Sequence, residues 1–228
     1  MSRIFLVRHG EASWHSDDYD RLTDRGHAQA RAVGVELVAR RVVPGVVMSG
    51  TLRRHRETAA GLLAGAQWPL TVVEDTRWNE LDADDIIRVH DPEHDTMTGA
   101  LAHFAGRGAP QDFESFFDQA MDRWLGGDGG HVESFTQFVE RVNAALDALV
   151  AGLAPQATAV VVTSGGVQNA IASQILGGGS DTWRRIFGMF PNTGLMRLTH
   201  GERGLRLRSL GELSHLERQP DLLSELIY

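Results

Sequence analysis

The sequence predicts an α/β protein, a three-layer sandwich in which helices flank a mostly parallel central sheet, with an inserted helical lobe. First, short apolar runs alternate with longer segments that repeat apolar residues at helical spacing, as parallel strands joined by crossover helices do. Second, the segment "ATAVVVT" is continuously apolar, which is typical of a strand buried on both faces of a parallel sheet.

The chain before residue 75 contains three apolar runs separated by two amphipathic segments. In the first segment Ala30, Val33 and Leu37 recur at helical spacing, and Thr23 or Asp24 precedes them as a cap. A Pro-Gly turn leads into the second apolar run. We therefore expect strands over residues 3–7, 44–49 and 69–74, and helices over residues 24–40 and 51–65.

Residues 75–130 differ in composition from the segments on either side. They are rich in acids and contain several histidines, with helical stretches over residues 97–105 and 113–125. The segments "RGAPQ" and "GGDGG" interrupt them. We interpret this part as a helical lid or insertion at about 75–130 within one domain that covers residues 1–228, and not as an independent domain.

The chain after residue 130 returns to alternating elements. Ser134 and Gln137 form a capping box in front of a helix that has one apolar face. Two apolar runs near the end are joined by "GERG", which favours a hairpin. We expect helices over residues 134–153 and 167–176, and strands over residues 157–163, 193–200 and 204–211.

The composition limits the classes of function. A net charge of -8 over 228 residues argues against a nucleic-acid partner, because binding to the phosphate backbone needs a basic face. The lack of cysteine excludes thiolate catalysis and Cys-ligated metals. No apolar run approaches the roughly 18–20 residues of a membrane span, and the run at residues 3–7 is too short for a signal peptide. We therefore expect a soluble, cytoplasmic protein with no membrane partner, whose oligomeric state the sequence leaves open.

Chemically useful residues follow three of the expected strands, in "VRHGE", "SGTLRRHRETA" and "TSGG". His9 offers a nucleophile or a general base. Arg8, together with Arg54, Arg53 or Arg56, offers guanidinium groups suited to an oxyanion. "TSGG" offers hydroxyls and bare backbone at the start of a helix, which favours an anion. Since ligands bind outside the carboxyl ends of parallel strands, these segments predict a phosphate pocket.

Each segment also has a simpler interpretation. A lone histidine after a strand is more often packed or solvated, and a cluster such as "RRHR" on a helix usually forms a solvated face. "SGG" is compatible with a tight turn from strand to helix. The occurrence of all three segments in this order favours the pocket, in which we expect Gly10 to keep the backbone clear of the anion.

Five segments carry a resemblance to a known family. They are "RHGE" at residues 8–11, "LTDRGHAQARAVG" from Leu22, "SGTLRRHRETA" from Ser49, "WNEL" with Glu80, and "VESFTQFVERV" from Val132. In these segments the sequence resembles the histidine phosphatase superfamily, also called the phosphoglycerate mutase-like family. The resemblance covers nearly the whole chain.

The resemblance implies a role for four residues. His9 would be the nucleophile and form a phosphohistidine, while Arg8 and Arg54 would clamp the phosphoryl oxygens. Glu80 would protonate the leaving oxygen and then activate water. The family needs no metal and no cofactor. Our first hypothesis is therefore a metal-independent phosphatase that acts on a small-molecule phosphate ester or a phosphoprotein.

The sequence departs from the family pattern at the end of the long strand. Ser164, followed by Gly165, stands where the family has a second histidine that contacts the transferring phosphoryl group. Serine can donate one hydrogen bond but carries no charge, which should cost about 1.5–3 kcal/mol, or roughly one to two decades in rate. We expect Ser164 and Gly165 to bind phosphate. The second hypothesis is a catalytically weak or inactive protein that binds a phosphate ligand.

A second departure lies in the first loop, where His15 replaces an asparagine that often touches phosphate in the family. We hypothesise that His15 binds phosphate and partly replaces the missing imidazole, with His131 as a weaker candidate. The alternative is that His15 is a solvated loop residue.

Residues 81–95 replace a segment common in sugar-phosphate members of the family. Their acids would repel a highly anionic substrate, which makes a phosphoglycerate mutase the least favoured hypothesis. His90 and His94 are four residues apart and could ligate a metal on a helix. Pro92 between them favours a solvated rim instead, so we expect no metal.

Overall fold

The computed structural model describes residues 1–13, 20–107 and 110–224. The chain divides into two compact units, one formed by Met1–Glu80 and Val142–Tyr228 and the other by Leu81–Arg141. The second unit overlaps the segment at about 75–130 that the sequence distinguishes by its composition.

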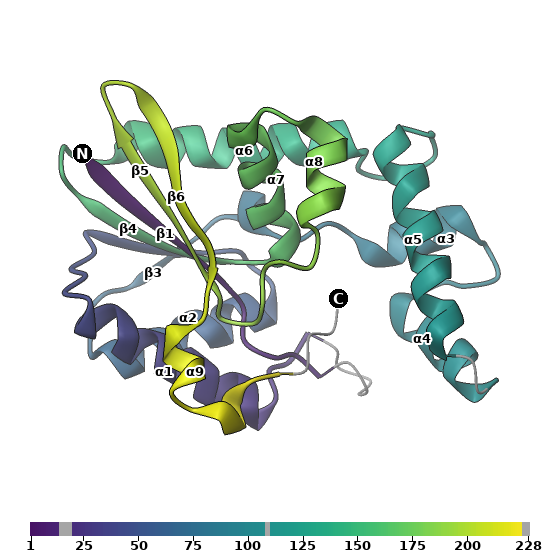
Figure 1. Ribbon diagram of the computed structural model, residues 1–228, viewed down its shortest axis with the longest axis horizontal. Helices are drawn as coiled ribbons and strands as arrows, with labels where there is room; N and C mark the ends of the chain where they lie inside the picture. Colours follow the sequence, from purple (N-terminus) through teal and green to yellow (C-terminus); the bar gives the residue numbers. More distant parts are fainter. Residues whose placement is uncertain (14–19, 108–109, 225–228) are drawn as a thin grey trace. The chain divides into compact units, whose positions relative to one another are not determined.

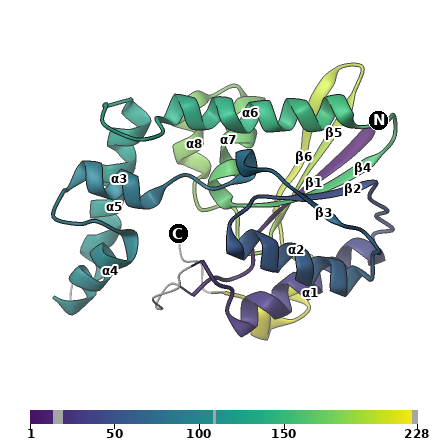
Figure 2. The ribbon, with the colours of Figure 1, turned by 180° about the vertical axis from the view of Figure 1, so that it is seen from behind.

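The first unit contains a six-stranded sheet in the order β3-β2-β4-β1-β5-β6 (Figures 1 and 2). Strands β3, β2, β4 and β1 are parallel to one another, and β5 and β6 run antiparallel to their neighbours. The mostly parallel sheet and the terminal hairpin are confirmed. The strands are β1 (Ser2–Arg8), β2 (Val46–Ser49), β3 (Val72–Glu74), β4 (Thr158–Thr163), β5 (Leu195–Gly201) and β6 (Gly204–Glu212).

Helices cover both faces of this sheet, as the three-layer sandwich requires. Figures 1 and 2 show α1, α2 and α9 on one face and α7 and α8 on the other. A core of apolar side chains, among them Phe5, Leu37 and Leu62, packs between the sheet and the first group. The helices are α1 (Asp24–Ala39), α2 (Arg53–Ala66), α7 (Gly165–Leu176), α8 (Gly179–Ile186) and α9 (Ser214–Glu217), with a 3-10 turn, η1, at Thr76–Trp78 and another, η2, at Pro220–Leu222.

The register of the parallel strands determines which residues meet at the carboxyl edge of the sheet. Arg8 pairs with Thr163 across β1 and β4, and Ser49 pairs with Val162 across β2 and β4. The three strands therefore end at the same level. The loops that follow them carry the three segments singled out in the sequence.

The second unit is helical and begins with an element that the sequence pattern did not predict. The stretches expected at 97–105 and 113–125 are the helices α4 (Met97–Gly106) and α5 (Pro110–Gly126). The first helix, α3 (Ala83–His90), lies where we expected an acidic rim. Its acids have structural roles, because the side chain of Asp82 caps α3 and that of Asp84 accepts from the backbone N–H of Met97.

The helix α6 (Phe135–Gly152) runs from the second unit into the first and starts at the predicted capping box. The N–H of Gln137 donates to the Ser134 hydroxyl at 3.3 Å, and the N–H of Ser134 donates to the Gln137 side-chain oxygen at 2.9 Å. This reciprocal pair satisfies two backbone donors that the first turn of a helix leaves open.

The histidines of residues 81–95 lie among aromatic rings rather than in a solvated rim. The ring centroid of His94 lies 4.7 Å from that of His103 and 5.5 Å from that of Phe116. The ring of His90 meets Phe116 edge-on at 5.2 Å. Within the described residues, no group of three or more His, Cys, Asp or Glu side chains could hold a metal ion. In the same part of the chain, no helix is both long and apolar enough to span a membrane.

Candidate active site

The backbone of His9 is held at the carboxyl edge of the sheet by three hydrogen bonds. Its N–H donates to the carbonyl oxygen of Thr163 at 2.8 Å, which extends the pairing of β1 with β4 by one residue. Its carbonyl oxygen accepts from the Thr193 N–H and from the Asn192 side chain, both at 3.2 Å. The residue is 4% exposed. The imidazole is thus presented from a rigid strand end.

The hydrogen bond of the His9 ring determines which ring nitrogen keeps its lone pair. Nδ1 lies 2.8 Å from the carbonyl oxygen of Gly10, which can only accept. Nδ1 therefore carries the proton, and Nε2 has a lone pair. Burial, followed by the positive charges of Arg54 and Arg8 and by His55, holds the pKa of His9 well below its usual value. At neutral pH the ring is neutral, as a nucleophile must be.

Gly10 has a steric role that the sequence did not predict. A Cβ at this position would lie 2.5 Å from the carbonyl oxygen of Gly26 in α1, so the backbone approach of α1 requires glycine here. The N–H of Gly10 donates to the Thr58 hydroxyl at 3.0 Å, and that hydroxyl donates to the carbonyl oxygen of Arg54 at 2.6 Å. Thr58 thereby ties the loop after His9 to the first turn of α2.

The start of α2 distinguishes Arg54 from the two neighbouring arginines. Arg54 is 7% exposed, and its Nη1 donates to Oδ1 of Asp20 at 2.7 Å. Arg53 and Arg56 are exposed and pair with the carboxylates of Glu57 and Glu74. The interpretation of "RRHR" as a solvated face therefore fits Arg53 and Arg56 and is wrong for Arg54.

Arg8 ends β1 and also takes part in the site. Its Nη1 donates to the carbonyl oxygen of Phe190, which orients the guanidinium. A Cβ at Gly165 would lie 3.5 Å from Nε of Arg8, so the backbone at the start of α7 runs close to this group. The positive charges of Arg54 and Arg8 both lower the pKa of the His9 ring, so two guanidinium groups lie near it.

Glu80 reaches the same edge of the sheet from the loop after η1. The hydroxyl of Thr163 donates to the carbonyl oxygen of Trp78 at 2.7 Å, and the side chain of Asn79 bonds with Thr51 at 2.7 and 2.9 Å. One carboxylate oxygen of Glu80 accepts from the backbone N–H of Gly166 at 3.0 Å. The carboxylate is therefore anchored at the N-terminus of α7, where the helix dipole favours negative charge.

Comparison with known proteins agrees with this arrangement. The sequence pattern of the histidine phosphatase superfamily (branch 1) matches residues 4–213. The chain belongs to the histidine phosphatase superfamily. Membership makes it a phosphoryl-transfer enzyme in the broad sense, since its relatives and structural neighbours are named as phosphatases and mutases.

Two relatives of this superfamily member differ in how far they match. The protein named "Probable phosphoglycerate mutase GpmB" from Citrobacter koseri is 27% identical over 95% of this chain and 96% of its own. The 2,3-bisphosphoglycerate-dependent phosphoglycerate mutase of Mesorhizobium japonicum is 36% identical, but the match covers 38% of this chain and 46% of that mutase. The chain therefore matches less than half of the second relative.

Solved structures share the fold of this superfamily member. YhfR of Bacillus stearothermophilus superposes with a TM-score of 0.71 at 20% identity, covering 95% of this chain and 100% of the other. The α-ribazole phosphatase of Shigella flexneri gives a TM-score of 0.66 at 20% identity, covering 92% and 96%. At such identities the likeness establishes the α/β architecture.

In this superfamily member, Ser164 is occupied by an interaction that the sequence did not predict. Ser164 precedes α7 and is fully buried, and its Oγ lies 2.6 Å from Nε2 of His55. The ring of His55 is also fully buried, and its centroid lies 5.8 Å from that of His9. Burial, followed by the charge of Arg54, holds the pKa of His55 well below its usual value, so this second imidazole is neutral.

Helical phase is the signal that could have identified His55. Its buried neighbours on α2 are Thr58, Ala59 and Leu62, at positions i+3, i+4 and i+7. This spacing defines the inward face of a helix. His55 therefore belongs to the core-facing stripe, and the solvated interpretation is wrong for this residue too.

Two further histidines were candidates for the phosphate site. His15 falls outside the residues that the structure describes. His131 belongs to the second unit, where its Nδ1 lies 3.5 Å from a carboxylate oxygen of Asp85.

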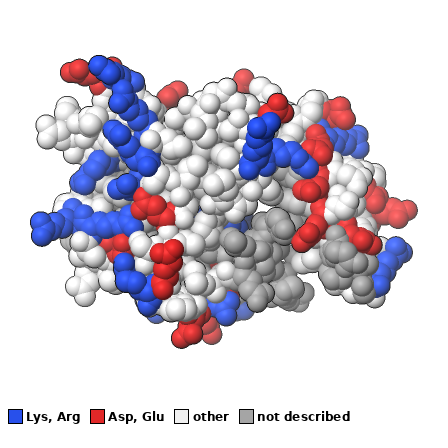
Figure 3. Space-filling view, in the orientation of Figure 1, with Lys and Arg blue, Asp and Glu red and all other residues white. Residues whose placement is uncertain are grey.

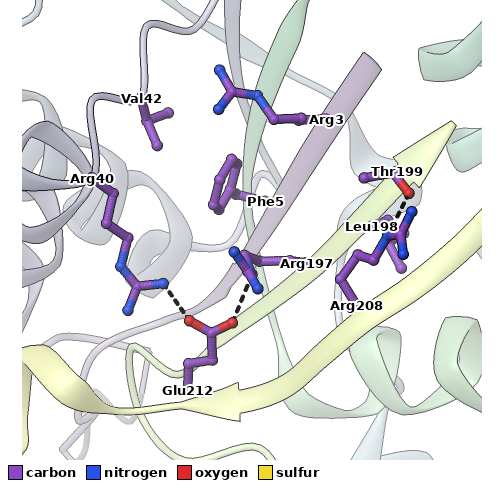
Figure 4. A pocket seen from close by; sticks show the side chains of 9 residues that line it. All are labelled: Arg3, Phe5, Arg40, Val42, Arg197, Leu198, Thr199, Arg208 and Glu212. Carbon is purple, nitrogen blue, oxygen red and sulfur yellow. Dashed lines mark hydrogen bonds and ion pairs between the residues drawn. The ribbon is translucent and has the colours of Figure 1, made fainter. Parts of the chain in front are cut away.

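A separate concavity on the first unit is rich in arginine. Figure 3 shows blue side chains gathered over β5 and β6. A cavity of about 580 Å³ lies in this region, and Figure 4 draws the side chains that line it. Arg40 and Arg197 both point to Glu212, and Nε of Arg208 donates to the Thr199 hydroxyl at 2.9 Å. These pairs join α1 to the hairpin and give the arginines drawn there a structural role.

Proposed function

We propose that the chain is a metal-independent phosphatase that hydrolyses phosphomonoesters through a phosphohistidine on His9. The observation that carries this proposal is the state of the His9 ring. It is buried and neutral, and because Nδ1 is bound to the Gly10 carbonyl, Nε2 keeps its lone pair. A packed structural histidine would need neither this tautomer nor two guanidinium groups beside it.

In the first step, Nε2 of His9 attacks phosphorus, and the bond from phosphorus to the ester oxygen breaks. Glu80 gives its proton to the leaving oxygen, which departs as the alcohol. Arg8, Arg54 and the N-terminus of α7 stabilise the charge on the phosphoryl oxygens during transfer.

In the second step, the ionised Glu80 takes a proton from water, and the resulting hydroxide attacks phosphorus. The bond from Nε2 to phosphorus breaks, inorganic phosphate leaves, and His9 and protonated Glu80 are restored. The bond from the Gly166 N–H holds the Glu80 carboxylate at the start of α7, where the ionised form that this step needs is stabilised.

The substrate class is a small-molecule phosphate ester or a phosphoprotein. Because some relatives are named as phosphoglycerate mutases, mutase activity is a further candidate function for this chain. The acids of residues 81–95 argue against it, although the charge of Asp85 is offset by its ion pair with Arg88. The replacement of the second family histidine by Ser164 supports the alternative of a weak or inactive phosphate-binding protein.

A panel of phosphate esters tests the proposal on wild type and His9→Ala, with His27→Ala as the control. His27 lies in α1, outside the site. We expect His9→Ala to lose roughly three or more decades of turnover, and His27→Ala to lose none. A phosphoryl group trapped by acid-free quenching should appear on wild type only. Retained phosphate binding without turnover above His9→Ala would instead establish the binding-protein alternative.

A further inference from the structure

Two fully buried side chains meet beside the nucleophile, and the proposed reaction leaves one of them without a role. His55 comes from the first turn of α2, and Ser164 precedes α7. Nε2 of His55 lies 2.6 Å from Oγ of Ser164. We propose that His55 is a positioning residue that directs the Ser164 hydroxyl hydrogen toward the transferring phosphoryl group. The inference rests on the proposed function and adds a residue to its machinery.

The position of Ser164 at the start of α7 leaves its hydroxyl available for this role. A serine that caps a helix ordinarily accepts from a backbone N–H in the first turn. Here the side chain makes no capping bond, and the N–H of Gly166 donates to Glu80 instead. The hydroxyl and the carboxylate of Glu80 therefore share one helix end, and the hydroxyl pairs with His55.

The number of hydrogens that His55 and Ser164 carry determines which of them donates the hydrogen bond between them. A neutral imidazole carries one N–H, and a serine hydroxyl carries one O–H. Within the described residues, Nδ1 of His55 has no hydrogen-bond partner. A buried N–H without an acceptor is rarer than a buried acceptor without a donor, so the proton belongs on Nε2. Nε2–H then donates to Oγ of Ser164, and the hydroxyl hydrogen points to a different acceptor.

Gly50 makes room for the His55 ring. A Cβ on Gly50 would lie 2.2 Å from Nδ1 and 2.9 Å from Cε1 of His55, and 2.6 Å from Oδ1 of Asn79. Any larger residue would therefore displace the ring or the Asn79 side chain that holds the loop before Glu80. The histidine in the first turn of α2 therefore fits only because the residue that follows β2 is a glycine.

Serine at position 164 completes this arrangement. Because the hydroxyl lies 2.6 Å from Nε2 of His55, a histidine ring at 164 that took the same direction would overlap the ring of His55. The small serine side chain leaves this space to His55. The chain brings its second imidazole to the site from α2, and the serine carries the hydrogen bond from that ring toward the substrate.

Steady-state kinetics on a phosphomonoester hydrolysed by wild type, with the full chain, test the pair. We expect Ser164→Ala and His55→Leu each to lower kcat by roughly 10- to 100-fold with a smaller change in KM. Because the two act as a unit, the double variant should lose no more than either single variant. His55→Gln, whose amide can still donate to Ser164, should recover part of the loss. If the fold-losses in kcat of the two single variants multiply in the double variant, or if Ser164→Ala is fully active, the proposal is wrong.

Ser173→Ala provides the matched control. Ser173 is a buried serine of the same helix α7, and its hydroxyl bonds to the carbonyl oxygen of Asn169 at 2.8 Å. It should retain wild-type kcat and vanadate affinity. Thermal unfolding of each variant shows whether its loss of kcat comes from misfolding. If another variant misfolds, the kinetics of Ser164→Ala, which removes only one atom, decide whether the proposal holds.

Vanadate binding separates a failure of this inference from a failure of the proposed function. If wild type hydrolyses no ester, the phosphatase proposal fails, yet the pair can still be tested as an anion-binding device. Ser164→Ala and His55→Leu should then weaken vanadate binding equally and without further loss in the double variant. Unchanged vanadate affinity in both would reject the inference by itself. A ¹⁵N spectrum that shows the His55 proton on Nδ1 would reject it as well.

Discussion

At the scale of single residues, charge and burial together set the chemistry of His9. The Gly10 carbonyl selects the tautomer, and burial with the adjacent Arg54 and Arg8 keeps the ring neutral. The same arginines would bind a phosphoryl group. In the proposed reaction, this one pair of charges prepares both the nucleophile and the anion site.

The titration of His9 tests this account. Since its pKa lies well below the usual value of about 6.5, the ring should remain neutral as pH falls through that value and protonate only at distinctly lower pH. Arg54→Gln removes a neighbouring positive charge, so it should raise the pKa of His9. NMR of ¹³C-labelled histidine measures both. Arg53→Gln, which alters an exposed arginine on the same turn, should leave the titration unchanged. An ordinary pKa in wild type would contradict the buried, neutral ring.

At the scale of elements, the site depends on how α2 is fastened to the loop after β1. Thr58 is fully buried and links the Gly10 N–H to the carbonyl oxygen of Arg54. The loop after His9 and the first turn of α2 therefore share one hydroxyl. A shift of α2 would move Arg54 and His55 away from His9 together.

Thr58→Val preserves the shape of the side chain and removes this hydroxyl. The Gly10 N–H then stays buried without an acceptor, which should lower the free energy of unfolding by about 1–3 kcal/mol. We expect kcat to fall as well, because the loop and α2 lose their common link. Thr58→Ser keeps the oxygen and should retain most of kcat. Urea unfolding and steady-state kinetics make the comparison, and equal activity of the two variants would show that the hydroxyl does not position the site.

At the scale of the whole molecule, the net charge of -8 opposes the approach of anionic substrates, while in the proposed site Arg8 and Arg54 would attract the phosphoryl group locally. Salt screens the long-range repulsion more than the short-range attraction in the pocket. The balance between the two therefore depends on ionic strength and on charge carried by the rest of the substrate.

Two phosphomonoesters that differ by a remote carboxylate measure this effect. The ratio of kcat/KM for the more anionic ester to that for the less anionic one should rise with ionic strength, because screening relieves the extra repulsion. Using a ratio cancels competition by salt anions for the pocket, which affects both esters alike. A ratio that falls with salt would mean that local positive charge dominates the approach.

Most of the fold could be predicted because its elements have local signals. Three of these signals were recognised in the sequence and are present in the structure: the apolar run of β4, the Thr23 cap of α1 and the capping box before α6. The helix α3 was missed because its acids look like a solvated segment. Only the folded chain shows that Asp82 and Asp85 are used inside the second unit, where Asp85 is 3% exposed.

The sequence by itself indicated that Arg8, His9 and Arg54 meet at one edge of a parallel sheet, because Arg8 and His9 stand at the end of β1 and Arg54 follows β2. The family resemblance added Glu80, which lies in the loop after η1. Tertiary structure alone decided which arginine of α2 turns inward and what the Ser164 hydroxyl contacts. The bond from His55 to Ser164 joins residues 109 positions apart, and it forms only where α2 and the start of α7 meet. No local pattern encodes such a contact, because it depends on strand register, helical phase and the space left by Gly50.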